Sequence, residues 1–151
     1  MSFKYRVVTI VFTLDYTIPP FRIISDLERY FDISNCVVDI KAFSGDVIAC
    51  TLCGKNVVAR VKNTDTVFID RMCVKYKIVE SNIICIKVKI PYYNVGEEDL
   101  NRLLKQYANI MVSEVQYVEN TTVYFCILEL RRDLPKRIKS KAGYLDVVEI
   151  V

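Results

Sequence analysis

The chain of 151 residues contains no histidine. Histidine is the general base of many hydrolases, the usual partner of serine and cysteine nucleophiles, and a ligand in most catalytic zinc sites. The absence of histidine therefore argues against most of these enzyme classes, because their chemistry depends on it. A glycine-rich loop of the kind that cradles phosphates is also missing. We expect a protein that is not an enzyme.

The sequence also lacks a long apolar run. No stretch approaches the roughly 18 apolar residues that a membrane span needs, and the first residues, Met1–Arg6, lack the pattern of a signal peptide. Without secretion, the six cysteines are expected to be reduced thiols. We therefore expect an intracellular protein of the cytoplasm or nucleus, without a membrane partner.

What the chain does contain is regular apolar spacing, clearest in residues 83–151. Alternate residues from 84 to 90 are apolar, which predicts a strand, and Leu100, Leu103 and Leu104 follow at helical spacing. The remaining predicted elements are strands at 110–118 and 123–130, a short helix within 131–141 and a strand at 144–151. This β-α-β-β-α-β order is typical of ferredoxin-like domains and of RNA-recognition-motif (RRM) domains.

The first half of the chain follows the same plan. Its predicted elements are strands at 5–14, 36–43, 47–52 and 71–79, a helix that starts at Pro19-Pro20, and a short helix at 56–62. The polar tripeptide at 80–82 marks a boundary between a domain of residues 1–80 and a domain of residues 83–151. The predicted fold class is α+β: two tandem RRM-like domains of the ferredoxin-like βαββαβ type, each with an antiparallel four-stranded sheet.

One run in the second half resembles a known family. Residues 123–135 (VYFCILELRRDLP), followed by Gly143, Tyr144 and a valine-rich strand, resemble the RRM-like domain of Gag-like proteins of non-LTR retrotransposons and of related CCHC-type zinc-finger proteins. The resemblance implies non-catalytic binding of single-stranded RNA or DNA by the second domain. In that family a CCHC zinc knuckle follows the last strand. Residues 1–151 contain no such motif, so zinc-dependent binding is not carried over by the resemblance.

A basic segment at 131–141 is the first candidate for this binding. Six cations stand there against one acid, Asp133. Such density can neutralise phosphates, and about four contacts would give a log–log salt slope of about −3 for a single strand. The alternative is a solvated surface loop. The six cations are Arg131, Arg132, Lys136, Arg137, Lys139 and Lys141.

The predicted face of the second sheet supplies the remaining candidates. Lys87 and Lys89 alternate with apolar residues and are expected on the open face, with Phe125 beside them. The Phe125 ring would stack on a base while the ammonium groups hold phosphates. The alternatives are that Phe125 is covered or that the register is the opposite one. Low sequence specificity is expected, because few planar polar groups are placed to read base edges.

The pair Cys50 and Cys53 has the spacing of half a zinc site. A tetrahedral site needs four ligands, and the sequence has neither a histidine nor a second Cys-x-x-Cys pair. Buried thiols are the better interpretation. We predict no metal site and no cofactor.

The open face of the first domain favours a different function. Its predicted side chains are small and fairly apolar, and its lysines lie only at the edges. Such a surface suits protein contact better than stacking on bases. A protein-interaction or self-association module is therefore the alternative function. The residues concerned are Val7, Thr9, Val11, Ala49 and Thr51, with Lys41, Lys75 and Lys77 at the edges.

Overall fold

The computed structural model describes residues 6–44, 46–91 and 95–151. Contacts between residues divide the described chain into two compact units, residues 6–81 and residues 82–151. The first five residues of the predicted first domain lie outside the described part. Among the described residues, no helix combines the length and apolar character needed to cross a membrane.

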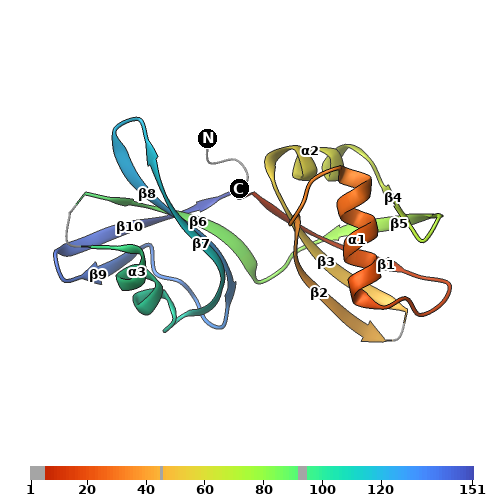
Figure 1. Cartoon of the computed structure of the whole chain (residues 1–151). Coiled ribbons are helices and arrows are strands. Elements are labelled where there is room, and N and C mark those ends of the chain that lie inside the picture. The colour runs from red at the N-terminus through yellow and green to blue at the C-terminus, as the bar shows by residue number, and fades with distance from the viewer. Residues whose placement is uncertain (1–5, 45, 92–94) are drawn as a thin grey trace. The chain divides into compact units, whose positions relative to one another are not determined.

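The first unit is one antiparallel sheet with two helices packed on it (Figure 1). Its strands lie side by side in the order β2-β3-β1-β5-β4. The elements are β1 (Val7–Thr13), α1 (Pro20–Phe31), β2 (Val37–Ser44), β3 (Val47–Cys53), α2 (Lys55–Asn63), β4 (Thr66–Ile69) and β5 (Met72–Val79).

Helix α1 shows why this sequence folds as it does. Pro20 occupies the start of the helix, where its fixed φ and missing N–H cost nothing. Ile23, Leu27 and Phe31 form the buried stripe that packs on the sheet. The helix ends at Asp32, which adopts a left-handed conformation with φ 56°. Both helices of this unit share one core with alternate residues of the strands, so they cover the same face of the sheet.

The second unit repeats the strand order with one helix fewer. Its strands lie side by side as β7-β8-β6-β10-β9, and α3 packs on one face (Figure 1). The elements are β6 (Ile83–Ile90), α3 (Glu97–Leu104), β7 (Ala108–Val118), β8 (Thr121–Leu130), β9 (Arg137–Ser140) and β10 (Gly143–Ile150).

Both units are α+β, with the antiparallel strand order of a tandem RRM-like, ferredoxin-like fold. The prediction of four strands per sheet was wrong, because each sheet has five. The extra strands, β4 and β9, are four residues long and pair with the following strand as hairpins at the sheet edge. Strand β9 also replaces the short helix predicted within 131–141. Its residue Ile138 packs into the core while the flanking residues Arg137 and Lys139 are exposed, so the segment follows a strand's two-residue period.

Candidate nucleic-acid interface

The alternation of side chains along β6 and β10 creates two different faces on the second sheet. Ile86, Val88 and Leu145 point into the core beneath α3. Lys87 and Lys89 of β6 and Tyr144 of β10 occupy the alternating positions, which places them on the opposite face. Lys87, Lys89 and Tyr144 line a common groove of about 300 Å³. We call this the Tyr144 groove.

Tyr144 is the exposed aromatic of this face, with 59% of its surface accessible. The β9–β10 register sets Lys139 opposite Tyr144 and Arg137 opposite Asp146. The guanidinium carbon of Arg137 lies 5.3 Å from the centroid of the Tyr144 ring. Its Nε atom lies 3.3 Å from an Asp146 carboxylate oxygen. An aromatic ring is thus bordered by cations from two neighbouring strands.

Such an arrangement has a definite chemical capacity. A tyrosine ring offers a flat apolar surface on which a base can stack. The lysine ammonium groups and the arginine guanidinium are donors for phosphate oxygens. Of the predicted site residues, Lys87 and Lys89 line the groove with this ring, and Arg137 lies over the ring. Lys139 is opposite Tyr144 in the register but lines a separate pocket with Arg102 and Leu103 of α3.

Phe125 is not available for the predicted stacking role. Its position is the expected one, opposite Lys87 in the β6–β8 register and on the face away from the core residue Tyr124. Its side chain is nevertheless only 1% exposed. A buried ring cannot receive a base, so the choice of Phe125 was wrong. Sequence reasoning used Tyr144 only as part of a resemblance, although its place next to buried Leu145 in an alternating strand was a usable signal.

The predicted basic segment is divided between two places. Arg131 donates hydrogen bonds from its guanidinium to the carbonyls of Lys105 and Ala108, and Arg132 lies with its guanidinium carbon 4.6 Å from the ring centroid of Tyr107. The backbone N–H groups of both arginines also donate to the carbonyl of Tyr107, at 2.8 and 3.2 Å. These two side chains hold the turn between α3 and β7. The phosphate contacts predicted for them remain predictions.

Lys136 and Lys141 lie on either side of β9 and are exposed. The carbonyl of Lys136 accepts the N–H of Val147 at 2.8 Å, which ties the loop before β9 to β10. Lys141 lies in the β9–β10 turn, where Gly143 has φ 127° and only glycine is unstrained. Phosphate binding by these two lysines is likewise still a prediction.

Four of the six cysteines are buried, whereas Cys53 is partly exposed and Cys73 is exposed. Cys50 is fully buried, and burial raises its pKa to about 12. Burial also raises the pKa of Cys53, its partner in the C-x-x-C pair. High thiol pKa values work against metal binding, because the thiolate is the ligand. Within the described ranges no group of three or more metal-ligating side chains comes together.

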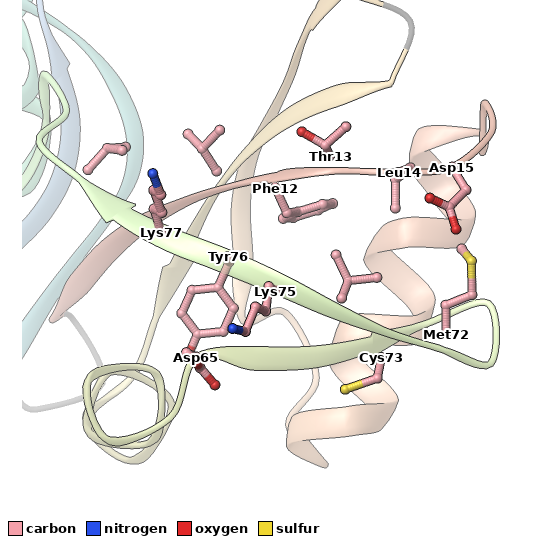
Figure 2. Close-up of a pocket in the computed structure, with 13 residues that line it drawn as sticks. Phe12, Thr13, Leu14, Asp15, Asp65, Met72, Cys73, Lys75, Tyr76 and Lys77 are labelled. Atoms are coloured by element: carbon pink, nitrogen blue, oxygen red, sulfur yellow. The ribbon is translucent and has the colours of Figure 1, made fainter.

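The first unit carries a larger groove of about 740 Å³. Strands β1 and β5 pair from Thr9↔Val79 to Phe12↔Tyr76 and then diverge, and the groove opens in the wedge between them (Figure 2). Lys75 and Lys77 lie along its β5 wall, with Asp15 and Asp65 nearby. On the predicted interaction face, Thr9 and Thr51 are buried and their hydroxyl oxygens are 2.8 Å apart.

Comparisons with known proteins leave the family open. No family model matches the chain, and no curated protein matches it. Among solved structures, one similar chain is titled "Structure of the RNA binding domain of Hrp1 in complex with RNA". The match has 12% identity and a TM-score of 0.37, and it covers 98% of each chain. A likeness at this TM-score carries no argument about function, which must rest on the geometry of the chain itself.

Proposed function

We propose that this protein binds single-stranded RNA or DNA without catalysing a reaction, and that the Tyr144 groove is the contact surface. One observation carries the proposal. The exposed ring of Tyr144 lies on the same sheet face as Lys87 and Lys89, with the guanidinium of Arg137 beside it. The resemblance of residues 123–135 to Gag-like RRM-like domains supports the same function and belongs to this proposal.

Binding by this surface is expected to depend on charge and stacking more than on sequence. Lysine ammonium groups act as point charges and do not match the planar edge of a base. Arg137, which lies over the Tyr144 ring, already contacts Asp146. A tyrosine ring stacks on any base. The affinity should therefore come from contacts with the phosphate backbone of the nucleic acid and with the flat faces of its bases, and every nucleotide sequence offers both.

The proposal is tested by titrating a fluorescently labelled single-stranded RNA with the protein at low and at high salt. With three or four phosphate contacts, the log–log slope of affinity against salt should be about −2 to −3. Changing Lys87→Glu and Lys89→Glu together should weaken binding at low salt by at least about tenfold. Each change replaces a cation that can bind a phosphate by an anion that repels it.

A matched control is the pair Lys55→Glu and Lys62→Glu, on helix α2 of the first unit. This control makes the same change in net charge, but at residues of the other unit. An equal loss of affinity in both pairs would show that only overall charge matters. An absence of binding at low salt by the unaltered protein would refute the proposal.

The alternative, a protein-interaction module, is favoured by the groove between β1 and β5. That groove borders Val11 on the predicted interaction face, and its mixed charges suit a peptide better than a polyanion. Sedimentation of the protein without RNA tests self-association. A concentration-dependent oligomer that Val11→Asp dissolves would support this alternative.

A further inference from the structure

A small pocket in the first unit gathers arginines. It has a volume of about 280 Å³ and lies between α1 and the turn that joins β4 to β5. Arg22, Arg29 and Arg71 line it, and Arg60 lies over the ring of Tyr30, another lining residue, at 4.2 Å from the ring centroid. These are four of the five arginines in residues 6–81, whereas the lysines of that unit are elsewhere.

The acids of this pocket are already engaged. The Asp70 carboxylate accepts hydrogen bonds from the Tyr16 hydroxyl and from Arg22, whose Nη2 lies 2.7 Å away. A carboxylate oxygen of Asp26 accepts the backbone N–H of Asp70 at 2.8 Å. These contacts fix the β4–β5 turn against α1 and the loop before it. They engage the carboxylates of Asp26 and Asp70, but of the three lining arginines only Arg22 takes part.

Arg29 and Arg71 are the cations left over. Neither side chain has a hydrogen-bond or ion-pair partner among the residues that the structure describes. Arg71 also holds a left-handed backbone with φ 66°. A side chain other than glycine or asparagine is disfavoured there by roughly 1 kcal/mol or more. Backbone strain of this kind is often found at functional sites. The strained turn presents a cation to the pocket that Arg29 also lines.

An aromatic surface adjoins these cations. Phe68 lines the pocket and is 52% exposed, with its ring centroid 6.1 Å from that of Tyr30. The ring of Tyr30 is in turn in contact with the guanidinium of Arg60. Arginine is the side chain best suited to bidentate contact with phosphate, and an exposed ring beside it suits a base.

We propose that this arginine pocket is a second binding site for single-stranded nucleic acid, in which Arg29 and Arg71 hold a phosphodiester and Phe68 stacks on the adjacent base. The inference rests on the proposed function and extends it to the first unit. The surface involved is formed by α1 and the β4–β5 hairpin, and it is separate from the Tyr144 groove in sequence and in domain.

The test uses a full-length chain whose Tyr144 groove is disabled by Lys87→Glu, Lys89→Glu and Tyr144→Ala. Labelled single-stranded RNA is titrated at low salt. We expect weak, salt-sensitive binding to remain. Adding Arg29→Gln and Arg71→Gln should raise the dissociation constant about tenfold or more, and adding Phe68→Ala should raise it about fivefold or more.

Two controls keep structural effects apart from binding. Lys55→Gln with Lys62→Gln removes the same charge from exposed positions on α2, outside the pocket, and should change the dissociation constant less than about twofold. Arg71→Gly relieves the left-handed strain, so its melting temperature should be equal or higher while its binding is weaker. Weakened binding in a more stable protein cannot be attributed to unfolding.

The outcomes separate the two proposals. If the intact chain binds RNA and the disabled chain does not, the Tyr144 groove accounts for all binding and the arginine pocket is refuted as a site. Equal losses from the arginine pair and the lysine pair would also refute it. If even the intact chain fails to bind, both proposals fall together.

Discussion

Arg137 contacts Tyr144 across the β9–β10 hairpin, with 5.3 Å between the guanidinium carbon and the ring centroid. The same guanidinium forms an ion pair with Asp146, two residues further along β10. Ring, cation and acid therefore lie on one face of two adjacent strands. The guanidinium lies over the ring, as in a cation–π contact, so a cation borders the surface proposed for stacking.

The first prediction concerns Tyr144 itself. Changing Tyr144→Ala should raise the dissociation constant for single-stranded RNA by roughly 5-fold to 100-fold, since stacking on one aromatic contributes about 1–3 kcal/mol. Tyr144→Phe keeps an aromatic ring and should change the dissociation constant less than about threefold. The measurement is fluorescence anisotropy with a labelled oligonucleotide.

Tyr117 provides the matched control. It is 73% exposed on β7, and the register places it opposite Thr122, on the same side of the sheet as the core residue Tyr124. Tyr117→Ala should leave RNA affinity nearly unchanged. A loss comparable with that of Tyr144→Ala would argue against a localised groove.

The second prediction concerns Arg131, which the structure places at the end of α3 rather than in the groove. Its guanidinium donates to the carbonyls of Lys105 and Ala108. Arg131→Ala should lower the free energy of unfolding by about 1–2 kcal/mol, because two carbonyls, one at the end of α3 and one at the start of β7, lose a charged donor. Thermal denaturation should show a melting point lower by roughly 4–8 °C for each kcal/mol.

Lys136 is the comparison for this change. It belongs to the same basic segment and is exposed, and only its backbone carbonyl takes part in a described hydrogen bond. Lys136→Ala should therefore leave the melting temperature almost unaltered. Similar stability losses in both variants would mean that the contacts of Arg131 contribute nothing specific.

The third prediction is a loss of stability in alkali. Burial raises the pKa of Cys50 to about 12 and those of Cys36 and Cys126 to about 11. A folded-state pKa above the unfolded value of about 9 means that the folded protein holds its proton more tightly. The contribution of these thiols is complete below about pH 9 and is lost as the pH rises toward 11 or 12. Urea denaturation at a series of pH values should show the midpoint falling above about pH 9.

A thiol variant identifies the source of that fall. Cys73 is exposed, so Cys73→Ala should leave the alkaline decline unchanged. Cys50→Ala should make the decline shallower, even though it lowers stability at neutral pH by leaving a small cavity. If the curve for Cys50→Ala keeps its full slope, buried thiols are not responsible.

The fourth prediction uses the hydrogen bond between Thr9 and Thr51. These residues are directly opposite in the β1–β3 register, and their hydroxyl oxygens are 2.8 Å apart in a buried setting. Each single change to valine should cost about 1–2 kcal/mol, because the partner hydroxyl is left unsatisfied. The double variant should be more stable than the sum of the single effects predicts, and a double-mutant cycle measures the difference. Strict additivity would show that the two hydroxyls do not interact.

The strands that sequence reasoning found best are those with long alternation. Apolar residues recur at every second position from Ile84 to Ile90, and the structure has β6 at Ile83–Ile90. The added strands β4 and β9 contain four residues each, too few for a period to stand out. The prediction therefore gave no element to residues 66–69 and placed a short helix within 131–141, where the two sheets gain their edge strands.

The candidate site was harder to predict for a related reason. Alternation tells which face a side chain lies on, and it placed Phe125 opposite Lys87 as the register has it. It does not tell whether that position is covered, and Phe125 is almost fully buried. Likewise, counting charges in residues 131–141 could not show that Arg131 binds carbonyls 26 and 23 residues earlier in the chain. Neither the burial of Phe125 nor the contacts of Arg131 follow from the pattern of neighbouring residues.

The added hairpins have a consequence for how such a chain can change. Each outer strand sits at the margin of its sheet and pairs with another strand along one edge only, so its outward-facing residues can change without disturbing the central strands. In the first unit the tip carries Arg71, and in the second the outer strand carries Arg137 and Lys139. Swapping these short ribbons between related chains would move these cations, and with them the proposed contacts to polyanions, while leaving the inner architecture in place.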